Sequence, residues 1–250
     1  MELQQYLPNF QQTQTPFYFY DTELLQRTFQ EASQEIQGIE NGHIHLALKA
    51  NNHPIMLQMA RTYGMGIDAV SGGEVELAVS AGIPNKKIVF AGVGKTDEEI
   101  RYALKHNILC FNVESVPEIE VIQELAQELK CTTNIAIRVN PNVDAHTHQN
   151  ITTGLEENKF GIALQDLVPT IKRILELPNL NYYGLHFHIG SQILEKEPFI
   201  KLCQKINRLQ TQLEKQGTFG SGKQLISVCN AFFHIYSLAG KNNFISIKRF

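Results

Sequence analysis

The sequence has no long run of basic residues and no surplus of charge. Its 22 Lys and Arg stand against 25 Asp and Glu, which gives a formal net charge of −3. Proteins that bind nucleic acid or anionic membranes carry a basic footprint, so this composition argues against both partners. No apolar stretch approaches the roughly 20 residues that a membrane-spanning helix needs. The polar start of the chain resembles neither a signal peptide nor a transit peptide, so we expect a cytoplasmic protein.

Cysteine is scarce and scattered. The four cysteines are Cys110, Cys131, Cys203 and Cys229. They form no C-x-x-C pair, which argues against a zinc site or a redox dithiol and favours buried reduced thiols. The chain of 250 residues is 43% hydrophobic, enough for one large core or two small domains. Because no Pro-, Gly- or Ser-rich linker occurs before about residue 216, one continuous domain is expected there.

Short apolar runs alternate with longer amphipathic stretches between residues 44 and 215. This alternation is typical of βα units in a parallel sheet. The predicted strands are 44–49, 66–70, 87–92, 108–113, 134–139 and 181–189, and the predicted helices are 53–63, 73–82, 96–107, 115–129, 165–176 and 197–215. Two capping boxes, Thr96 with Glu99 and Ser115 with Glu118, mark helix starts.

The ionisable residues of these strands share one parity. In a (β/α)8 barrel, alternate strand residues point into the barrel or out toward the helices, and active sites lie at the carboxyl ends of the strands. The inward set predicted from four strands is His45, Ala47 and Lys49; Asn112 and Glu114; Ala136, Arg138 and Asn140; His186 and His188. With Asp68, the charged members fall at the strand ends. Unpaired buried charge is costly, so the pattern indicates an active-site mouth.

A lysine in such a mouth suits imine chemistry, because desolvation is expected to lower its pKa and free the amine to attack a carbonyl. The alternative is that Lys49 is a solvated lysine beyond a strand end, and Asp68 and His188 at the same rim weigh against it. Gly-rich turns follow three strands, at 71–73, 92–94 and 190–191. Helix-start N–H groups there can receive an anion such as phosphate, although each turn is equally well a tight βα connection.

Several motifs resemble diaminopimelate decarboxylase, of the alanine racemase-like, fold type III class of pyridoxal-phosphate enzymes. The motifs are ALKANNHP (47–54), DAVSGGE (68–74), FAGVGKTDEEI (90–100), FNVES (111–115), RVNPNVDAHTHQNITTG (138–154), NKFGI (158–162) and GLHFHIGSQ (184–192). They run in order between about Thr15 and Gly217. Ornithine and arginine decarboxylases share the lysine and the His-Gly-Ser turn, whereas the VSGGE and DAHTH wording resembles the diaminopimelate branch.

The resemblance implies pyridoxal 5'-phosphate as cofactor and a role for each matching residue. Lys49 is the catalytic residue, which holds the cofactor as a Schiff base and returns a proton to the product. Asp68 pairs with that lysine, Arg138 lies beneath the cofactor, His188 stacks on its ring and Ser191 contacts its phosphate. Glu74 and His186 contact these residues rather than the cofactor itself. The implied reaction converts meso-diaminopimelate, a small amino acid, to L-lysine and CO2 as the last step of lysine biosynthesis.

Other candidate residues have simpler explanations. His146 and His148 have metal-like spacing, but they lack a Cys or carboxylate partner set, so no metal site is predicted. Glu114 has inward parity but is also explained as a cap for the helix that starts near Ser115, so it is not counted among the site residues. Asn51, Asn52 and His53 are explained as turn and N-cap residues.

The chain departs from the family after Gly217. We expect an N-terminal segment (1–21) with a strand, TPFYFYD, that normally joins the family's β-domain, a pyridoxal-phosphate barrel (22–217) and a divergent tail (218–250). LISVCN (225–230) can imitate a seventh strand, but Ala231, Phe232 and Phe233 stand where the family's phosphate-loop glycines belong. Neither the acid that pairs with the pyridine nitrogen nor the C-terminal β-domain is recognisable.

The fold class expected is therefore α/β, an incomplete (β/α)8 TIM barrel with about six recognisable βα units. Such a sheet is expected to expose an open strand edge. The function expected is a truncated or frameshifted, poorly active decarboxylase, from a family that forms homodimers. Two alternatives remain: a non-catalytic pyridoxal-phosphate barrel, and a decoy that pairs with a full-length paralogue.

Overall fold

A computed structural model describes residues 3–39, 41–49, 51–140, 160–190, 193, 196–217, 224–229 and 233–239. The strands are β1 (Gly42–Ala47), β2 (Gly66–Ala69), β3 (Ile88–Phe90), β4 (Cys110–Val113), β5 (Thr133–Arg138), β6 (Leu180–His188), β7 (Gln224–Cys229) and β8 (Phe233–Ala239). The α-helices are α1 (Leu7–Gln12), α2 (Thr22–Ile36), α3 (Pro54–Thr62), α4 (Gly72–Ser80), α5 (Asp97–Lys105), α6 (Val116–Glu128), α7 (Leu167–Glu176) and α8 (Glu197–Lys215). Short 3-10 turns occupy Leu3–Tyr6, Asn85–Lys87 and Leu164–Asp166.

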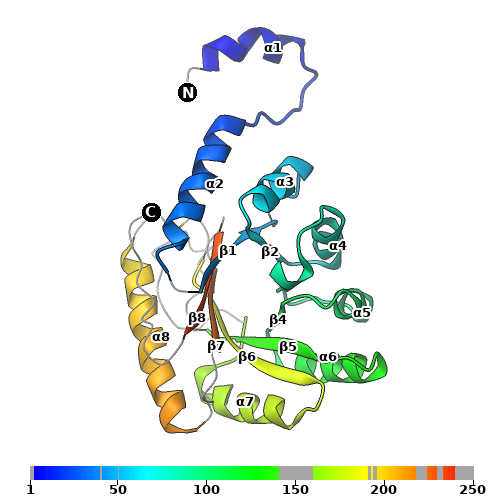
Figure 1. Ribbon diagram of the computed structural model, residues 1–250, viewed down its shortest axis with the longest axis vertical. Coiled ribbons are helices and arrows are strands. Elements are labelled where there is room, and N and C mark those ends of the chain that lie inside the picture. Colours follow the sequence, from blue (N-terminus) through cyan, green and yellow to red (C-terminus); the bar gives the residue numbers. More distant parts are fainter. Residues whose placement is uncertain are drawn as a thin grey trace.

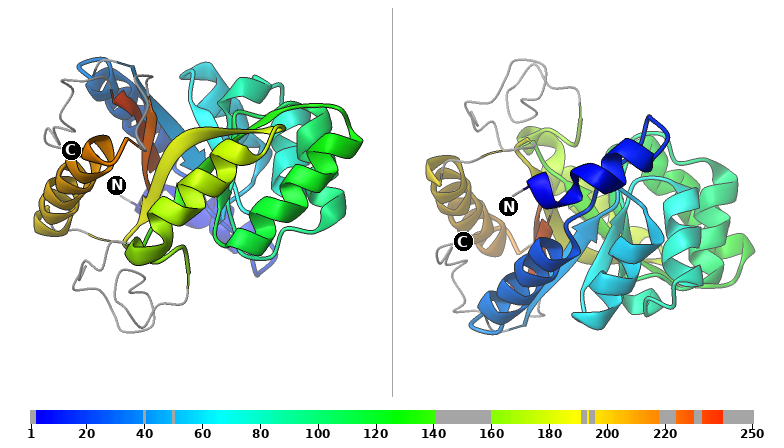
Figure 2. Two further views of the ribbon diagram at one scale, coloured as in Figure 1. Left: turned by 90° about the horizontal axis from the view of Figure 1, so that it is seen from below. Right: turned by 90° about the horizontal axis from the view of Figure 1, so that it is seen from above.

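The six predicted βα units are confirmed. Strands β1 to β6 are each followed by one of the helices α3 to α8, and neighbouring strands pair in parallel. The helices lie around the outside of the strands, and α4, α5 and α6 pack side by side (Figures 1 and 2). Among the described helices, none is both long and apolar enough to cross a membrane.

The expected open edge is wrong, because the sheet closes into a barrel. Strand β7 pairs in parallel with β6, as the seventh-strand interpretation predicted. Strand β8 runs antiparallel to both β7 and β1. A two-sided pairing of this kind satisfies the backbone groups that an edge would leave exposed. The eighth position of the barrel is thus filled by a reversed strand rather than by a further βα unit.

The N-terminal part begins with α1, which stands away from the barrel at one end of the molecule (Figure 1). Residues 14–21 form neither strand nor helix, so the strand assigned to TPFYFYD stays a prediction. Helix α2 follows, with the Asp21 side chain accepting a hydrogen bond of 2.9 Å from the Leu24 N–H at its start. Phe29 and Ala32 are its buried residues, and the helix contacts β1. Sequence analysis did not predict this helix.

The alternation of the strands divides the core into two layers. Outward-facing residues join one large apolar cluster with the helices, including Ile44, Leu46, Phe111, Ile137 and Phe187. A much smaller cluster of Val89, Cys110 and Ala136 packs separately from it. The predicted parity is confirmed at these positions. On strands β1 to β6, the inward layer is therefore poor in apolar side chains, and buried polar residues occupy much of it.

His45 and Gly66 illustrate how closely that interior is packed. They are paired neighbours on β1 and β2, and His45 is 2% exposed. Its Nδ1 lies 3.3 Å from the Ile67 carbonyl oxygen, so this nitrogen donates the hydrogen bond. Burial lowers the pKa of His45 to about 3, which keeps the ring neutral. A Cβ on Gly66 would lie 2.4 Å from the His45 ring and 2.4 Å from the Lys87 carbonyl oxygen.

Replacing Gly66 by alanine is therefore expected to destabilise the barrel by roughly 2–3 kcal/mol, because the backbone oxygen beside it cannot yield easily. Gly94→Ala is the matched control, since nothing lies within 4 Å of a Cβ built there. Urea unfolding followed by circular dichroism measures both variants. Equal stability of the two alanine variants would contradict the close packing of the His45 ring and the Lys87 carbonyl oxygen against Gly66.

Candidate functional site

The carboxyl ends of the strands bring the predicted site residues to one end of the barrel. Asp68 lies on β2, Arg138 ends β5, and His186 and His188 lie at the end of β6. Lys49 follows β1 by two residues. The register pairs Ala47 with Asp68 and Arg138 with His186, so these side chains occupy neighbouring strands. This is the end at which TIM-barrel enzymes carry their active sites.

Lys49 lies at the rim of this mouth. Its side chain is exposed, and its charge lowers the pKa values of Asp68 and Glu74 and also that of His186. The amine is thus within electrostatic range of three of the predicted site residues while still accessible from solvent. The sequence predicted those companions, and it also predicted a desolvated amine, which the exposed side chain does not show. An accessible amine can be reached by an incoming carbonyl compound.

Asp68 is the most deeply buried carboxyl of the mouth. It is 0% exposed, and burial raises its pKa to about 7, although Lys49 acts in the opposite direction. Glu74 has a smaller rise in pKa, caused by burial and opposed by its hydrogen bond from the Val70 N–H at 2.8 Å. Two carboxyls of different character therefore face the same lysine. With a pKa of about 7, Asp68 changes charge near neutrality.

The two histidines of β6 are buried at 2% and 8% exposure for His186 and His188 respectively. Burial lowers the pKa of His186 well below its ordinary value, and the positive charge of Arg138 lowers it further. A neutral imidazole is the form in which a histidine can lie beside a cationic guanidinium without repulsion.

Arg138 is held by Glu114, whose role the sequence left open. The Arg138 Nη1 lies 2.6 Å from Glu114 Oε1, and the two side chains are only 12% and 5% exposed. The guanidinium also lies 5.4 Å from the centre of the Phe160 ring, a cation–π distance. Glu114 therefore belongs to the mouth. The inward parity of β4 predicts that Glu114 points into the barrel. The alternative explanation, a helix cap, does not account for its ion pair with Arg138.

The helix starts that follow two of the three Gly-rich turns are already capped by the protein's own groups. At the start of α4, the Gly72 N–H donates to Glu99 Oε1 at 2.6 Å, and Ser71 caps the helix. At the start of α5, Thr96 and Glu99 form a complete capping box. Few backbone N–H groups at these two helix starts are therefore left to bind a phosphate. Ser191, in the third turn after β6, lies outside the described residues, as do His146 and His148.

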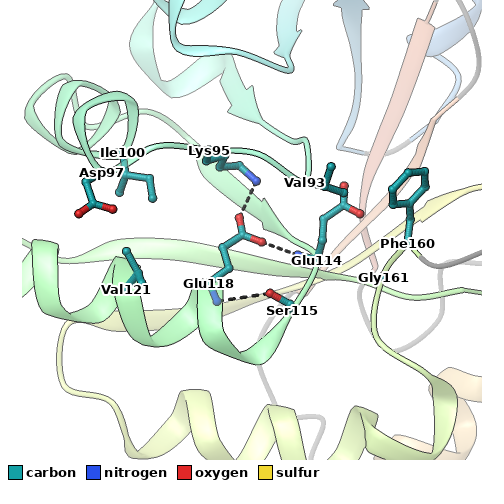
Figure 3. Close-up of a pocket in the computed structure, with 10 residues that line it drawn as sticks. All are labelled: Val93, Lys95, Asp97, Ile100, Glu114, Ser115, Glu118, Val121, Phe160 and Gly161. Carbon is teal, nitrogen blue, oxygen red and sulfur yellow. Dashed lines mark hydrogen bonds and ion pairs between the residues drawn. The ribbon is translucent and has the colours of Figure 1, made fainter.

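A shallow cleft of about 330 Å3 adjoins the mouth beside Glu114 (Figure 3). It runs between the starts of α5 and α6, and its walls include Lys95, Ser115, Glu118 and Phe160. In the described part of the chain, no three His, Cys, Asp or Glu side chains gather as a metal site would require.

The interior offers polar atoms to a ligand. Asn112 is 0% exposed, and neither its Nδ2 nor its Oδ1 has a hydrogen-bond partner among the described residues. Glu114 Oε2 is also buried without such a partner in that part of the chain. Buried polar groups are normally paired, so these atoms mark a place where a further polar group fits. A compound with an aldehyde for Lys49 and several hydrogen-bonding groups, as pyridoxal phosphate has, suits this donor and acceptor set.

Comparison with known proteins identifies the class to which this barrel belongs. The family described as pyridoxal-dependent decarboxylase, pyridoxal binding domain, matches residues 22–228, so the chain belongs to that family. The match continues beyond Gly217, where the recognisable motifs of the sequence end. Pyridoxal phosphate is accordingly the cofactor of the family, and the polar mouth of the barrel is the place that fits it.

Within the family, the chain is similar to diaminopimelate decarboxylases. It is 53% identical over 208 residues to that of Bacteroides thetaiotaomicron, covering 83% of this chain and 54% of the relative. The crystal structure of diaminopimelate decarboxylase from Helicobacter pylori complexed with L-lysine matches with a TM-score of 0.78 and 41% identity, over 85% of this chain and 54% of that one. The M. jannaschii enzyme in co-complex with L-lysine gives 0.69 and 38%, over 77% and 46%. The chain spans about half the length of these relatives.

Asp68→Asn is expected to change how the stability of the chain depends on pH. The folded-state pKa of about 7 lies above 3.8, the ordinary value for an aspartate, so the folded protein binds the proton more tightly than the unfolded one. Stability therefore falls as the pH rises from about 4 to about 7, by at most on the order of 4 kcal/mol. The asparagine variant lacks this fall.

Urea unfolding at a series of pH values measures the difference between wild type and variant. It is expected to grow in favour of the variant up to about pH 7 and then to level off. Glu31→Gln, at an exposed position on α2, is the control and is expected to show no such trend. A constant difference across the pH range would contradict the raised pKa of Asp68.

Proposed function

We propose that this chain is the pyridoxal-phosphate barrel of a diaminopimelate decarboxylase, a carboxy-lyase that converts meso-2,6-diaminopimelate to L-lysine and CO2. The observation that carries the proposal is the gathering of Lys49, Asp68, Arg138 and His188 at the carboxyl ends of neighbouring strands. The similarity to diaminopimelate decarboxylases, two of them crystallised with L-lysine, supports the choice of substrate.

The residues divide the work according to their positions. Lys49 would hold the cofactor covalently through its ε-amine and later deliver a proton to the product, and it is accessible enough for both. Asp68 would set the charge around that amine, since it titrates near neutrality. Arg138 would carry a fixed positive charge beneath the cofactor, oriented by Glu114. When bound, the cofactor supplies an electron sink for the electron pair left by the departing CO2.

The remaining assignments rest on the resemblance of the motifs. His188 would contact the cofactor ring and Ser191 its phosphate, while Glu74 and His186 support Lys49 and Arg138. His186 is suited to this because it stays neutral in its buried position. The Val70 N–H fixes the Glu74 carboxylate by a bond of 2.8 Å, so this group is held in place before any ligand arrives.

We further propose that the 250 residues by themselves decarboxylate slowly. The curated relatives are about twice as long. The glycines expected after β7 are replaced by Ala231, Phe232 and Phe233, and the acid expected beyond them is not recognisable. A weaker phosphate site and an unenforced pyridine charge would both reduce the rate. A homodimer and a cytoplasmic location are proposed on the same family basis and on composition.

Lys49→Ala is expected to abolish covalent cofactor binding. Wild-type chain mixed with pyridoxal phosphate should develop an absorbance band in the visible range, and borohydride should remove this band and leave the cofactor attached to the peptide that contains Lys49. Lys105→Ala, at an exposed lysine in the last turn of α5, is the control and should behave as wild type. Equal labelling of the wild type and the Lys49 variant would reject Lys49 as the attachment site.

Release of CO2 from meso-diaminopimelate tests the reaction itself. The wild-type chain with cofactor is expected to release CO2 far below an ordinary enzymatic turnover of about 10 per second. Loss of that residual rate in Lys49→Ala would assign it to the site. A chain that binds cofactor without any Lys49-dependent release is a non-catalytic barrel. A chain that binds none, but co-elutes with a full-length decarboxylase on size exclusion, is a decoy partner.

A further inference from the structure

Three successive strand–helix junctions of the barrel repeat one arrangement. A Ser or Thr hydroxyl caps the helix by accepting from the backbone N–H three residues on, where a glutamate stands. The carboxylate of that glutamate turns back to accept from a backbone N–H at the end of the strand or at the cap. The pairs are Ser71 with Glu74, Thr96 with Glu99 and Ser115 with Glu118, and their backbone donors are Val70, Thr96 and Glu114.

Each of these glutamates also reaches the preceding βα unit. Glu99 accepts from the Gly72 N–H at 2.6 Å, and Glu118 Oε1 lies 2.6 Å from Lys95 Nζ. Glu74 lies within electrostatic range of Lys49. The junctions are thus linked in sequence around the mouth, and in two of them the link is a carboxylate that faces a lysine.

Lys95 is the buried lysine of this series. Its side chain is 1% exposed, and its ammonium donates to the Gly92 carbonyl at 2.7 Å, to the Asn112 carbonyl at 3.0 Å and to Glu118. An ammonium has three N–H donors, so all of them have acceptors and Nζ cannot turn without losing one. The lysine joins the loop after β3, the end of β4 and the first turn of α6, as Figure 3 shows in part.

The hydrogen bonds continue from Lys95 to the cofactor mouth. Glu118 Oε2 accepts from the Glu114 N–H at 2.8 Å, which fixes the backbone from which the Glu114 side chain leaves (Figure 3). Glu114 Oε1 in turn accepts from Arg138 at 2.6 Å. Lys95 is therefore the first member of a series of hydrogen bonds that runs through Glu118 and Glu114 to Arg138. Its charge also lowers the pKa of Asp68 and that of His186.

We propose that Lys95 is a positioning residue of the pyridoxal-phosphate site, which acts through Glu118 and Glu114 to fix the orientation of the Arg138 guanidinium. The inference rests on the proposed function, because it concerns how well the mouth holds the cofactor. The three N–H donors of Lys95 are all taken up by protein acceptors, so none is left to bind a ligand directly. A group that must be held in place gains from such buried support, because its partners lose rotational freedom in advance.

The first test needs no cofactor. Amide hydrogen exchange of the Glu114 N–H is compared in the wild type and in Lys95→Met, with the Val70 N–H of the neighbouring junction as an internal reference. Releasing Glu118 is expected to speed exchange at Glu114 by about five- to tenfold and to leave Val70 unchanged. Glu118→Gln serves as the milder second variant, since glutamine keeps one acceptor and loses the other. Unchanged exchange at Glu114 in both variants would show that Lys95 and Glu118 do not fix the Glu114 backbone.

The second test measures the dissociation constant of pyridoxal phosphate from its visible absorbance. Lys95→Met is expected to weaken binding by about tenfold and Glu118→Gln by a few-fold, as the loss of one or two charged hydrogen bonds in the support implies. Lys87→Met is the matched control, because Lys87 donates a single bond of 2.6 Å to the Gly64 carbonyl, ahead of β2. It should bind cofactor as the wild type does.

The two measurements separate this inference from the proposed function. A wild-type chain that takes up no cofactor on Lys49 defeats the proposed function, while the exchange experiment still decides whether Lys95 fixes Glu114. Faster exchange at Glu114 with unchanged cofactor affinity in both variants overturns the positioning role and leaves Lys95 as a clamp of the fold. Changes in both measurements support the proposal.

Discussion

Charge inside a closed barrel has to be paired or neutralised, and this requirement determines which side chains lie at the carboxyl ends of the strands. Among the side chains that the structure describes, only a few apolar ones fill the interior, and histidines, carboxyls and an arginine occupy positions where aliphatic residues would pack without cost. Each charged group is accommodated in a different way. Arg138 has a carboxylate partner, His186 stays neutral and Asp68 titrates near neutral pH. The barrel thereby keeps a polar interior ready for a polar ligand.

The same requirement explains why glutamates are so common at the strand–helix junctions. A carboxylate in the third position of a helix satisfies backbone donors that would otherwise face the mouth unpaired. It also offers a second oxygen. In Glu118 this oxygen lies beside the Lys95 ammonium, and in Glu99 it accepts from the Gly72 N–H. Capping is usually a matter of helix stability alone. Here it also ties one βα unit to the one before it, so local folding signals contribute to the geometry of the site.

Much of this structure could be predicted from sequence. The six βα units follow from the alternation of apolar runs with amphipathic stretches, and the inward parity of Asp68, Arg138 and His188 follows from the strand period of two. Lys49 was found by parity and by resemblance together. The spacing of Leu25, Phe29, Ala32 and Ile36 is also typical of an amphipathic helix, the one that the structure forms at Thr22–Ile36.

Other features could not be predicted from short stretches of the sequence. Closure of the barrel by β8 depends on pairing with β1, some 190 residues earlier in the chain, and no short-range pattern specifies such a partner. Lys95 follows a Gly-rich turn that suggests an anion site, whereas the turn's carbonyl receives the lysine ammonium. Glu114 satisfies two explanations at once, and only the position of Arg138 distinguishes them.

The reversed direction of β8 also decides where the chain leaves the barrel. Ala239 pairs with Gln224, the first residue of β7, so the strand finishes at the end of the barrel remote from Lys49. A parallel eighth strand would instead deliver the chain to the rim of the cofactor mouth. An affinity tag or fluorescent fusion appended after this strand would accordingly depart from the floor of the barrel and leave the opening clear.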